Sequence, residues 1–250
     1  MHVSPKDIQL LIRDKYAGNT NADTRDDIVR LENGEPLAYV IGWVPFLGLS
    51  IRLDSRPLIP RPETEWWTEA LCEHLREKFG TQPFSFLDLC AGSGAIGLAV
   101  LSRFPSAQVA FAELSPLHSA LIHMNIDENN LDSSRADIRS GDLFEPFAHA
   151  KFDIIATNPP YIPHTRQLED SVSKFEPSEA LFAGPDGLDI IKRIVREAPA
   201  HMRTQGELWI ECDTTNIIET AEHLQATECT SVEIRTDLYG RPRVAVGYFS

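Results

Sequence analysis

Residues 152–161 read Phe-Asp-Ile-Ile-Ala-Thr-Asn-Pro-Pro-Tyr, and this stretch decides the fold prediction. The apolar run 152–157 is typical of a buried parallel strand. In an open α/β sheet, ligands bind beyond the carboxyl ends of the strands. The two prolines stiffen the loop and remove two backbone donors, which leaves free carbonyls beside an amide and an aromatic ring. We interpret the loop as a site that accepts two hydrogen bonds from a planar –NH2 group, although Asn-Pro alone is also a common turn opener.

Strand and helix patterns alternate on both sides of this stretch. Strands are predicted at 84–89, 108–113, 135–140, 152–157 and 207–211, and helices at 95–103, 116–129, 186–202 and 216–225. Repeated βα units indicate a mostly parallel sheet with helices on both faces. The tail 231–249 predicts two further strands, which can add an antiparallel edge to such a sheet.

The first 62 residues have a different pattern. Residues 5–33 predict two short helices that cannot bury a core of their own and must dock on the rest. Residues 37–53 are rich in aromatic and β-branched side chains and predict a β-hairpin. Pro62 is placed to begin a helix that ends before Gly80. We therefore divide the chain into a helical N-terminal segment (1–34), a hairpin with its connector (35–62) and a main α/β domain (63–250).

Composition limits the classes of function. The chain has 250 residues and a formal net charge of −14, which weighs against duplex DNA or RNA as the main ligand and towards a protein or small molecule. No apolar stretch approaches the roughly 20 residues of a membrane span, and the first residues lack the features of a secretion signal, so we expect a cytoplasmic protein without membrane association. The four cysteines form no C-x-x-C pair, and we predict no metal site.

A glycine-rich turn at residues 87–97, LDLCAGSGAIG, is the second signal. Gly92 and Gly94 allow the backbone to approach a ligand, and the helix beyond offers unpaired N–H groups. Gly92-x-Gly94-x-x-Gly97 also matches the dinucleotide fingerprint by letter. Asp88, however, would repel a diphosphate at the mouth of this loop, and it could hold a cationic ligand instead.

Acidic residues follow the next two predicted strands. Glu113 lies about 20 residues beyond the loop, where an acidic side chain typically binds ribose hydroxyls. Asp142 and Leu143 follow the third strand, where they could pair with an exocyclic amine and pack on a purine ring. S-adenosylmethionine combines ribose, adenine and a cationic amino-acid tail, so we predict it as the cofactor.

Five blocks of sequence together resemble one family. They are LIPRPETE at 58–65, DLCAGSGAIGLAV at 88–100, NPPYI at 158–162, KFEPSEALFAGPDGL at 174–188 and DLYGRPRVAVGYF at 237–249. This set resembles the HemK/PrmC-type protein glutamine methyltransferases, which modify the glutamine of the Gly-Gly-Gln motif in peptide-chain release factors. The resemblance covers about residues 35 to 250. The N-P-P-Y block alone is shared with DNA adenine and some RNA methyltransferases.

The resemblance implies a class I, Rossmann-like methyltransferase fold with a mostly parallel seven-stranded sheet, and a release factor as the protein substrate. The cofactor-binding residues expected from the motifs and the resemblance are Asp88, Cys90, Ala91, Gly92, Ser93, Gly94, Glu113, Asp142, Leu143 and Asn158. The residues expected to bind the substrate are Asn158, Pro159, Pro160, Tyr161 and Arg61. Of these, Asn158, Pro159 and Tyr161 are assigned to catalysis: two acceptors for the amide N–H groups and one aromatic wall.

The chain departs from the family pattern twice. Cys90 replaces the first glycine of D-L-G-x-G-x-G, which suggests that no strongly positive φ is required at this position and that cofactor binding survives. The helical N-terminal part is much shorter than is usual in the family, which leaves open how a release factor would dock.

Two other functions are considered. A nucleic-acid N6-adenine methyltransferase would use the same N-P-P-Y after extruding the base, but it needs a basic face. A non-catalytic partner could retain the fold, and fold alone does not separate it from an enzyme. The intact Asn158 and glycine loop favour an enzyme, which we expect to be a monomer.

Overall fold

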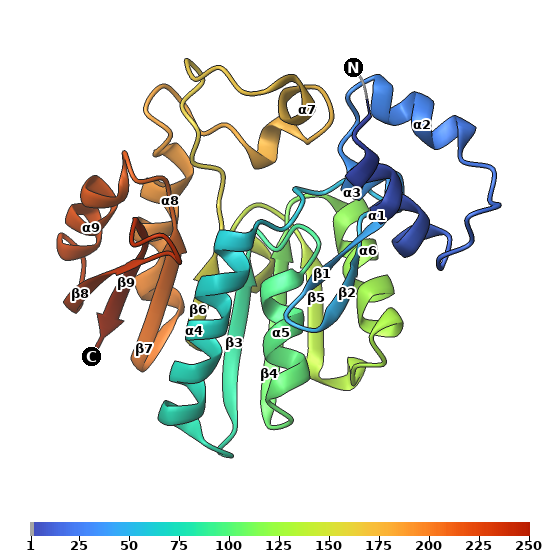
Figure 1. Cartoon of the computed structure of the whole chain (residues 1–250). Helices are drawn as coiled ribbons and strands as arrows, with labels where there is room; N and C mark the ends of the chain where they lie inside the picture. The colour runs from blue at the N-terminus through green and yellow to red at the C-terminus, as the bar shows by residue number, and fades with distance from the viewer. Residues whose placement is uncertain (1–2) are drawn as a thin grey trace.

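The computed structural model describes residues 3–250. Its centre is a seven-stranded sheet in the order β5-β4-β3-β6-β7-β9-β8 (Figure 1). The strands are β3 (Phe84–Leu89), β4 (Ala107–Glu113), β5 (Ala136–Ser140), β6 (Phe152–Thr157), β7 (Met202–Glu211), β8 (Cys229–Thr236) and β9 (Pro242–Phe249). Pairing is parallel from β5 through β7, and the β8–β9 hairpin adds the antiparallel edge. The predicted mostly parallel seven-stranded sheet is confirmed.

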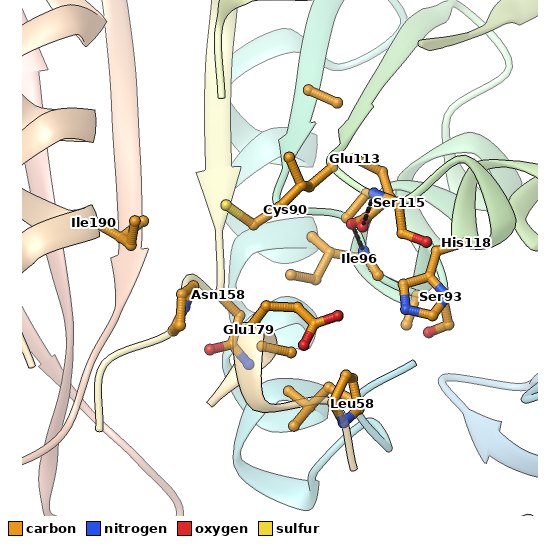
Figure 2. A pocket seen from close by; sticks show the side chains of 18 of the residues that line it. Leu58, Cys90, Ser93, Ile96, Glu113, Ser115, His118, Asn158, Glu179 and Ile190 are labelled. Atoms are coloured by element: carbon orange, nitrogen blue, oxygen red, sulfur yellow. Dashed lines mark hydrogen bonds between the residues drawn. The ribbon is translucent and has the colours of Figure 1, made fainter. Parts of the chain in front are cut away.

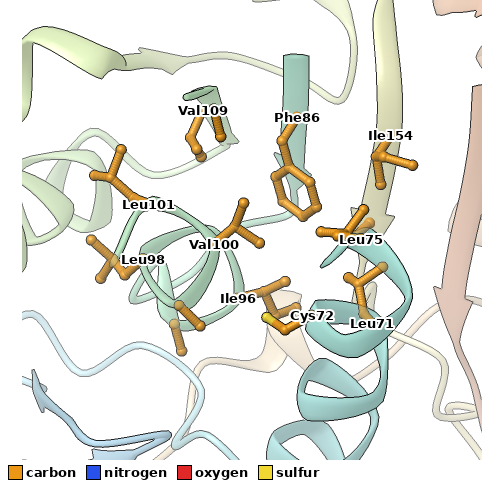
Figure 3. Close-up of a cluster of buried hydrophobic side chains, with 14 of the residues drawn as sticks. Leu71, Cys72, Leu75, Phe86, Ile96, Leu98, Val100, Leu101, Val109 and Ile154 are labelled. Carbon is orange, nitrogen blue, oxygen red and sulfur yellow. The ribbon is translucent and has the colours of Figure 1, made fainter. Parts of the chain in front are cut away.

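Helices cover both faces of this sheet. They are α4 (Pro62–Phe79), α5 (Ala95–Arg103), α6 (Pro116–Glu128), α8 (Asp189–Glu197) and α9 (Ile217–Gln225). Alternate residues of the central strands enter two separate cores. Phe86 packs with α4 and α5 (Figure 3), and Leu87 packs with α8 on the other face. Burial on both faces explains why the central strands read as continuous apolar runs.

Close packing at the glycine turn fixes the start of α5. Gly94 adopts a left-handed φ of 82° at the N-cap of this helix. A Cβ on Gly97 would come within 2.3 Å of the Phe111 ring on β4, so this glycine allows the helix to approach the sheet. The third glycine of the fingerprint is therefore explained by packing.

The N-terminal segment contains two helices, as predicted. Helix α1 (Pro5–Lys15) and helix α2 (Arg25–Glu32) are joined by Asp27, which accepts hydrogen bonds from Lys15 Nζ and the Tyr16 hydroxyl. The opening of the predicted hairpin is wrong, because residues 37–41 form the short helix α3 (Leu37–Ile41). Pro36 sets the entry and Gly42 ends the helix at a φ of 99°. Adjacent Tyr39 and Val40 are both buried, which suits a helix and not the alternating pattern of a half-buried strand.

The hairpin itself is shorter than predicted and docks on α6. Strands β1 (Trp43–Phe46) and β2 (Leu49–Arg52) form a separate antiparallel pair. Two amide side chains, Asn125 in α6 and Asn129 at its C-cap, form hydrogen bonds with the free edge of β2, as a further strand would. Asn129 accepts from the Ser50 N–H and donates to its carbonyl, both at 2.8 Å, and Asn125 accepts from the Arg52 N–H. The Asn125 amide also donates to the Ser93 carbonyl in the glycine loop at 3.0 Å.

Residues 158–188 lie above the sheet and contain two short elements that the sequence does not predict. These are α7 (Asp170–Ser173) and the 3₁₀ turn η3 (Ser178–Ala180). The predicted helix 186–202 is shorter in the structure, because a 3₁₀ turn with Pro199 replaces its last part and β7 already begins at Met202. Within residues 3–250, no helix is long and apolar enough to cross a membrane.

Candidate active site

A cavity of about 290 Å³ opens at the carboxyl ends of β3, β4 and β6 (Figure 2). This is the edge of the sheet where the sequence predicts the site. The predicted residues on its wall are Cys90, Ala91, Gly92, Ser93, Glu113, Asp142, Leu143, Asn158 and Pro160. The remaining predicted residues, which lie behind or beside the wall, are Asp88, Gly94, Pro159, Tyr161 and Arg61. For all of these predicted residues, on the wall or beside it, contact with a ligand stays a prediction.

The backbone at Cys90 corrects one expectation. Its φ is 60°, in the left-handed region, so the suggestion that no positive φ is required there is wrong. The turn from β3 into α5 requires this conformation at Cys90 as well as at Gly92 and Gly94, and a side chain at such a position costs roughly 1–2 kcal/mol. Burial raises the pKa of the Cys90 thiol to about 12, so it lines the cavity as a neutral group.

Glu113 is fixed at the end of β4. Its Oε2 accepts the Gly92 N–H at 2.7 Å and its Oε1 accepts the Ser115 N–H at 2.9 Å. These two bonds tie the glycine loop to the start of α6 and hold the carboxylate on the cavity wall (Figure 2). A carboxylate in this place retains lone pairs for hydroxyl donors, which fits the predicted ribose contact.

Asp88 supports the loop from below. Its side chain is buried under α5, with Oδ2 accepting the Gly97 N–H at 2.8 Å. Burial raises the pKa of this carboxyl well above its usual range. Among residues 3–250, Oδ1 has no hydrogen-bond partner, and because Asp88 does not line the cavity, its direct contact with a ligand stays a prediction.

The adenine end of the predicted site lies at the turn after β5. Asp142 and Leu143 both line the cavity, and Leu143 has a left-handed φ of 46°. Arg193 of α8 donates to both oxygens of Asp142, at 3.2 and 2.7 Å. This ion pair orients Asp142, whose remaining lone pairs are available to an exocyclic amine.

Sequence reasoning did not select several residues on the wall. His118, Ser115, Glu179, Thr64, Leu58 and Ile190 line the cavity from elements far apart in the chain. His118 Nδ1 lies 2.7 Å from Ser55 Oγ, and burial lowers the pKa of the imidazole. Thr64 and Glu179 do fall inside the R-P-E-T-E and F-E-P-S-E-A-L blocks, which is the only local signal for them.

Tyr161 contacts a buried glutamate, Glu211, that the sequence analysis did not single out, and Asn158 is linked to it through Thr64. The Asn158 amide donates to Thr64 Oγ1 at 3.2 Å, and the Tyr161 hydroxyl donates to Glu211 Oε1 at 3.2 Å. Burial and the Glu211 carboxylate raise the pKa of Tyr161 well above its usual range, so the phenol keeps its proton. Pro160, and not Tyr161, contributes to the cavity wall.

Arg61 closes the connector against the segment above the site. Its guanidinium pairs with Glu176, whose other oxygen accepts the Ile59 N–H at 3.1 Å. Glu176 is buried, so the pair joins the R-P-E-T-E block to the F-E-P block. This arrangement fits an ordering role for Glu176 over the site.

The comparisons with known proteins agree with this geometry. Residues 64–176 match the family model of the methyltransferase small domain. The release factor glutamine methyltransferase of Mycolicibacterium smegmatis is 34% identical over 83% of this chain and 73% of its own length. That of Deinococcus radiodurans is 35% identical over 87% of this chain and 76% of its own length.

Solved structures show the same fold at low sequence identity. The T. thermophilus 16S rRNA N2 methyltransferase, in complex with AdoMet and guanosine, has a TM-score of 0.60 and 19% identity over 83% of this chain and 50% of its own. A methyltransferase from Pyrococcus furiosus has a TM-score of 0.59 and 16% identity over 90% and 98%. The class I methyltransferase fold is thereby confirmed. With the relatives above, these findings place the chain in the release factor glutamine methyltransferase family.

Proposed function

We propose that this protein transfers a methyl group from S-adenosylmethionine to the side-chain amide nitrogen of the glutamine in the Gly-Gly-Gln motif of a peptide-chain release factor, and so supports translation termination. The observation that carries the proposal is the placement of Asn158. Its amide lies at the end of β6 on the cavity wall, and its nitrogen is turned away towards Thr64. The Asn158 oxygen is therefore left for an N–H of the substrate.

The cofactor is S-adenosylmethionine, which supplies an electrophilic methyl group when bound. Glu113 is positioned to accept from the ribose hydroxyls, and Leu143 to pack on the adenine. The loop 90–94 would hold the cationic end, and Asp88 would support the loop from below through its bond to the Gly97 N–H. These assignments rest on the order of the motifs along the chain and on the Glu113 carboxylate. The backbone N–H groups of Gly92 and Ser115 already fix the orientation of this carboxylate.

The protein's task in the reaction is to position a poor nucleophile. An amide nitrogen has a delocalised lone pair, so its orientation matters more than its basicity. Asn158 Oδ1 and the Pro159 carbonyl would each accept one N–H and align the nitrogen with the methyl group, and such positioning can contribute roughly 7–11 kcal/mol. The mechanism requires no general base, because the nitrogen becomes acidic after transfer and releases its proton.

The same proposal includes the setting of the reaction. The enzyme acts in the cytoplasm, as a monomer, on a protein and not on a nucleic acid. The net charge of −14 supports a protein substrate over a nucleic-acid one. Of the three parts of the chain, residues 63–250 carry the chemistry, the connector of the part 35–62 adds Leu58 and Pro60 to the cavity wall, and the segment 1–34 has no residue on that wall among those described.

Mass spectrometry tests the proposal directly. A purified release factor is incubated with the protein and S-adenosylmethionine, beside a copy whose Gly-Gly-Gln glutamine is mutated. One added methyl on the unmutated factor only is the expected result. No methyl on either factor, with cofactor binding intact by calorimetry, would overturn it and direct the assay to DNA or RNA adenine.

A further inference from the structure

Behind Asn158 lies a buried relay of side chains that ends at Glu211 on β7. Thr64 of α4 stands between them: its hydroxyl lies 3.2 Å from the Asn158 nitrogen and 2.7 Å from Glu211 Oε2. Thr64 and Glu211 are both almost fully buried, at 4% and 1% exposure. Water therefore has little access to the bonds that Glu211 accepts, whereas the bond between Asn158 and Thr64 lies at the cavity wall.

The relay has a defined direction. The Trp67 indole N–H can only donate, and it lies 2.6 Å from the same Glu211 oxygen. The Tyr161 hydroxyl donates to the other oxygen. An ionised Glu211 accepts from all three neighbours, so the single hydroxyl proton of Thr64 is committed to it. Thr64 then presents only lone pairs to Asn158.

This direction settles which end of the Asn158 amide faces the cavity. If the amide were flipped, its oxygen would lie against the Thr64 oxygen with no proton between them, and a buried acceptor would be left unpaired at a cost of about 1–3 kcal/mol. The –NH2 end therefore points to Thr64 and the oxygen to the substrate. Burial raises the pKa of Glu211 above its ordinary value, and its three donors and the neighbouring Arg243 offset this rise only in part. The role of Glu211 as acceptor rests on geometry, because three neighbours each place a donor on its two oxygens.

We propose that Glu211, acting through Thr64, is a positioning residue that fixes the orientation of the Asn158 amide and thereby selects substrates that present N–H donors. The inference rests on the proposed function, because it names the feature that makes the site read a primary amide by its –NH2 group. A substrate group that offers only an acceptor, such as an ester or a carboxylate oxygen, would meet the Asn158 oxygen unfavourably.

Three variants test the relay. Thr64→Val removes the hydroxyl at nearly constant shape, Thr64→Ser retains it, and Glu211→Leu removes the acceptor that holds the Thr64 proton. We expect Thr64→Val and Glu211→Leu to lower kcat for release-factor methylation by about 10- to 100-fold, with cofactor affinity unchanged. Thr64→Ser should recover most of the activity. Full kcat in Thr64→Val would overturn the inference.

Glu207→Leu is the matched control for a buried carboxylate on the same strand. Glu207 is 2% exposed and also accepts from a tryptophan, but its partners lie away from the cavity. Its kcat should equal that of the unmodified enzyme at temperatures where the variant stays folded. A loss as large as in Glu211→Leu would reduce the effect at Glu211 to general destabilisation and overturn the positioning role.

A second readout does not depend on the substrate. The side-chain –NH2 signals of Asn158, identified in nuclear magnetic resonance spectra by their loss in Asn158→Asp, should exchange slowly with solvent in the unmodified protein. Thr64→Val and Glu211→Leu should speed this exchange, and Thr64→Ser should not. If Thr64→Val leaves the exchange rate of the Asn158 –NH2 protons unchanged, the relay does not hold the amide. If the exchange pattern is as expected but no release factor is methylated, the proposed function fails while the relay stands.

Discussion

Strand β7 carries two buried glutamates on one face, and their surroundings differ. Both accept an indole N–H, from Trp209 at Glu207 and from Trp67 at Glu211. Glu207 also binds Lys78 and His74, and although burial raises its pKa, these hydrogen bonds outweigh burial and lower the pKa to about 2. Glu211, at the carboxyl end of the strand, has only neutral donors in hydrogen-bond contact, and burial raises its pKa.

The difference separates two uses of a buried charge. At Glu207 the protein supplies a cation of its own, Lys78, so the charge stabilises the fold. Glu211 has no directly bonded cation, and its carboxylate serves to orient hydroxyl and amide groups beside the cavity. The carboxyl end of β7 thus serves orientation, and the middle of the strand serves stability.

The largest effect is expected at the carboxyl edge itself. Asn158→Ala removes the acceptor that aligns the substrate nitrogen, and kcat for methyl transfer should fall by roughly 10²- to 10³-fold. S-adenosylmethionine should still bind in a calorimetric titration, because the loop 90–94 and Glu113 are intact. If methyl transfer survives this change, Asn158 does not align the substrate nitrogen, and the orienting role of the carboxyl edge is contradicted.

Glu207→Gln tests whether the charge of Glu207 stabilises the fold. A carboxyl whose pKa falls from 4.5 to about 2 on folding contributes about 3 kcal/mol to the free energy of unfolding at neutral pH. Because the folded pKa is the lower one, this contribution is present above pH 4.5 and is lost as the pH falls towards 2. Urea unfolding should show Glu207→Gln about 3 kcal/mol less stable at pH 7, with the gap closing in acid. An equal gap at pH 7 and pH 2.5 would contradict the assignment.

Glu113→Gln tests whether orientation at the carboxyl edge extends to the cofactor. Glutamine keeps one acceptor but sets an –NH2 group against a backbone N–H of Gly92 or Ser115, which disorders the loop. S-adenosylmethionine affinity should fall by about tenfold, or about 1.4 kcal/mol, in a calorimetric titration. Glu222→Gln, on the exposed face of α9, is the control and should bind normally.

The smallest effect is expected at Cys90, where the cost lies in the backbone and not in a charge. Cys90→Gly relieves a left-handed φ but also makes the unfolded chain more flexible, and the two effects nearly cancel. The free energy of unfolding should change by less than about 1 kcal/mol, whereas Cys90→Ala keeps the backbone cost. A large gain in stability for Cys90→Gly would mean that the turn stores more strain than its φ indicates.

The sequence predicts the parts of this molecule that depend on local pattern. Central strands such as 84–89 and 152–157 are readable because both faces are buried, and their ends then place Glu113 and Asn158 at one edge. The helix at Leu37–Ile41 was missed because its aromatic and branched residues favour a strand, although Pro36 and Gly42 mark its ends. The Cys90 conformation was missed because the residue type argued against it.

The relay behind Asn158 could not be predicted in the same way. Thr64 and Glu211 are 147 positions apart, and each is unremarkable in its own element: one lies in the first turn of a helix, the other at the end of a strand. Only the packing of α4 on β7 brings them together. Long-range partners of this kind leave no periodic trace in a single sequence.

The amide of Asn125 has a consequence for how the protein opens. This one buried side chain bonds to Arg52 in the hairpin and to Ser93 in the glycine loop. Detaching the hairpin would leave the Asn125 oxygen without its Arg52 partner and loosen the side chain that also holds a carbonyl of the loop that receives the cofactor. The two regions belong to one cooperative unit of local unfolding, and a ligand that orders the loop should slow amide hydrogen exchange in a hairpin it never touches.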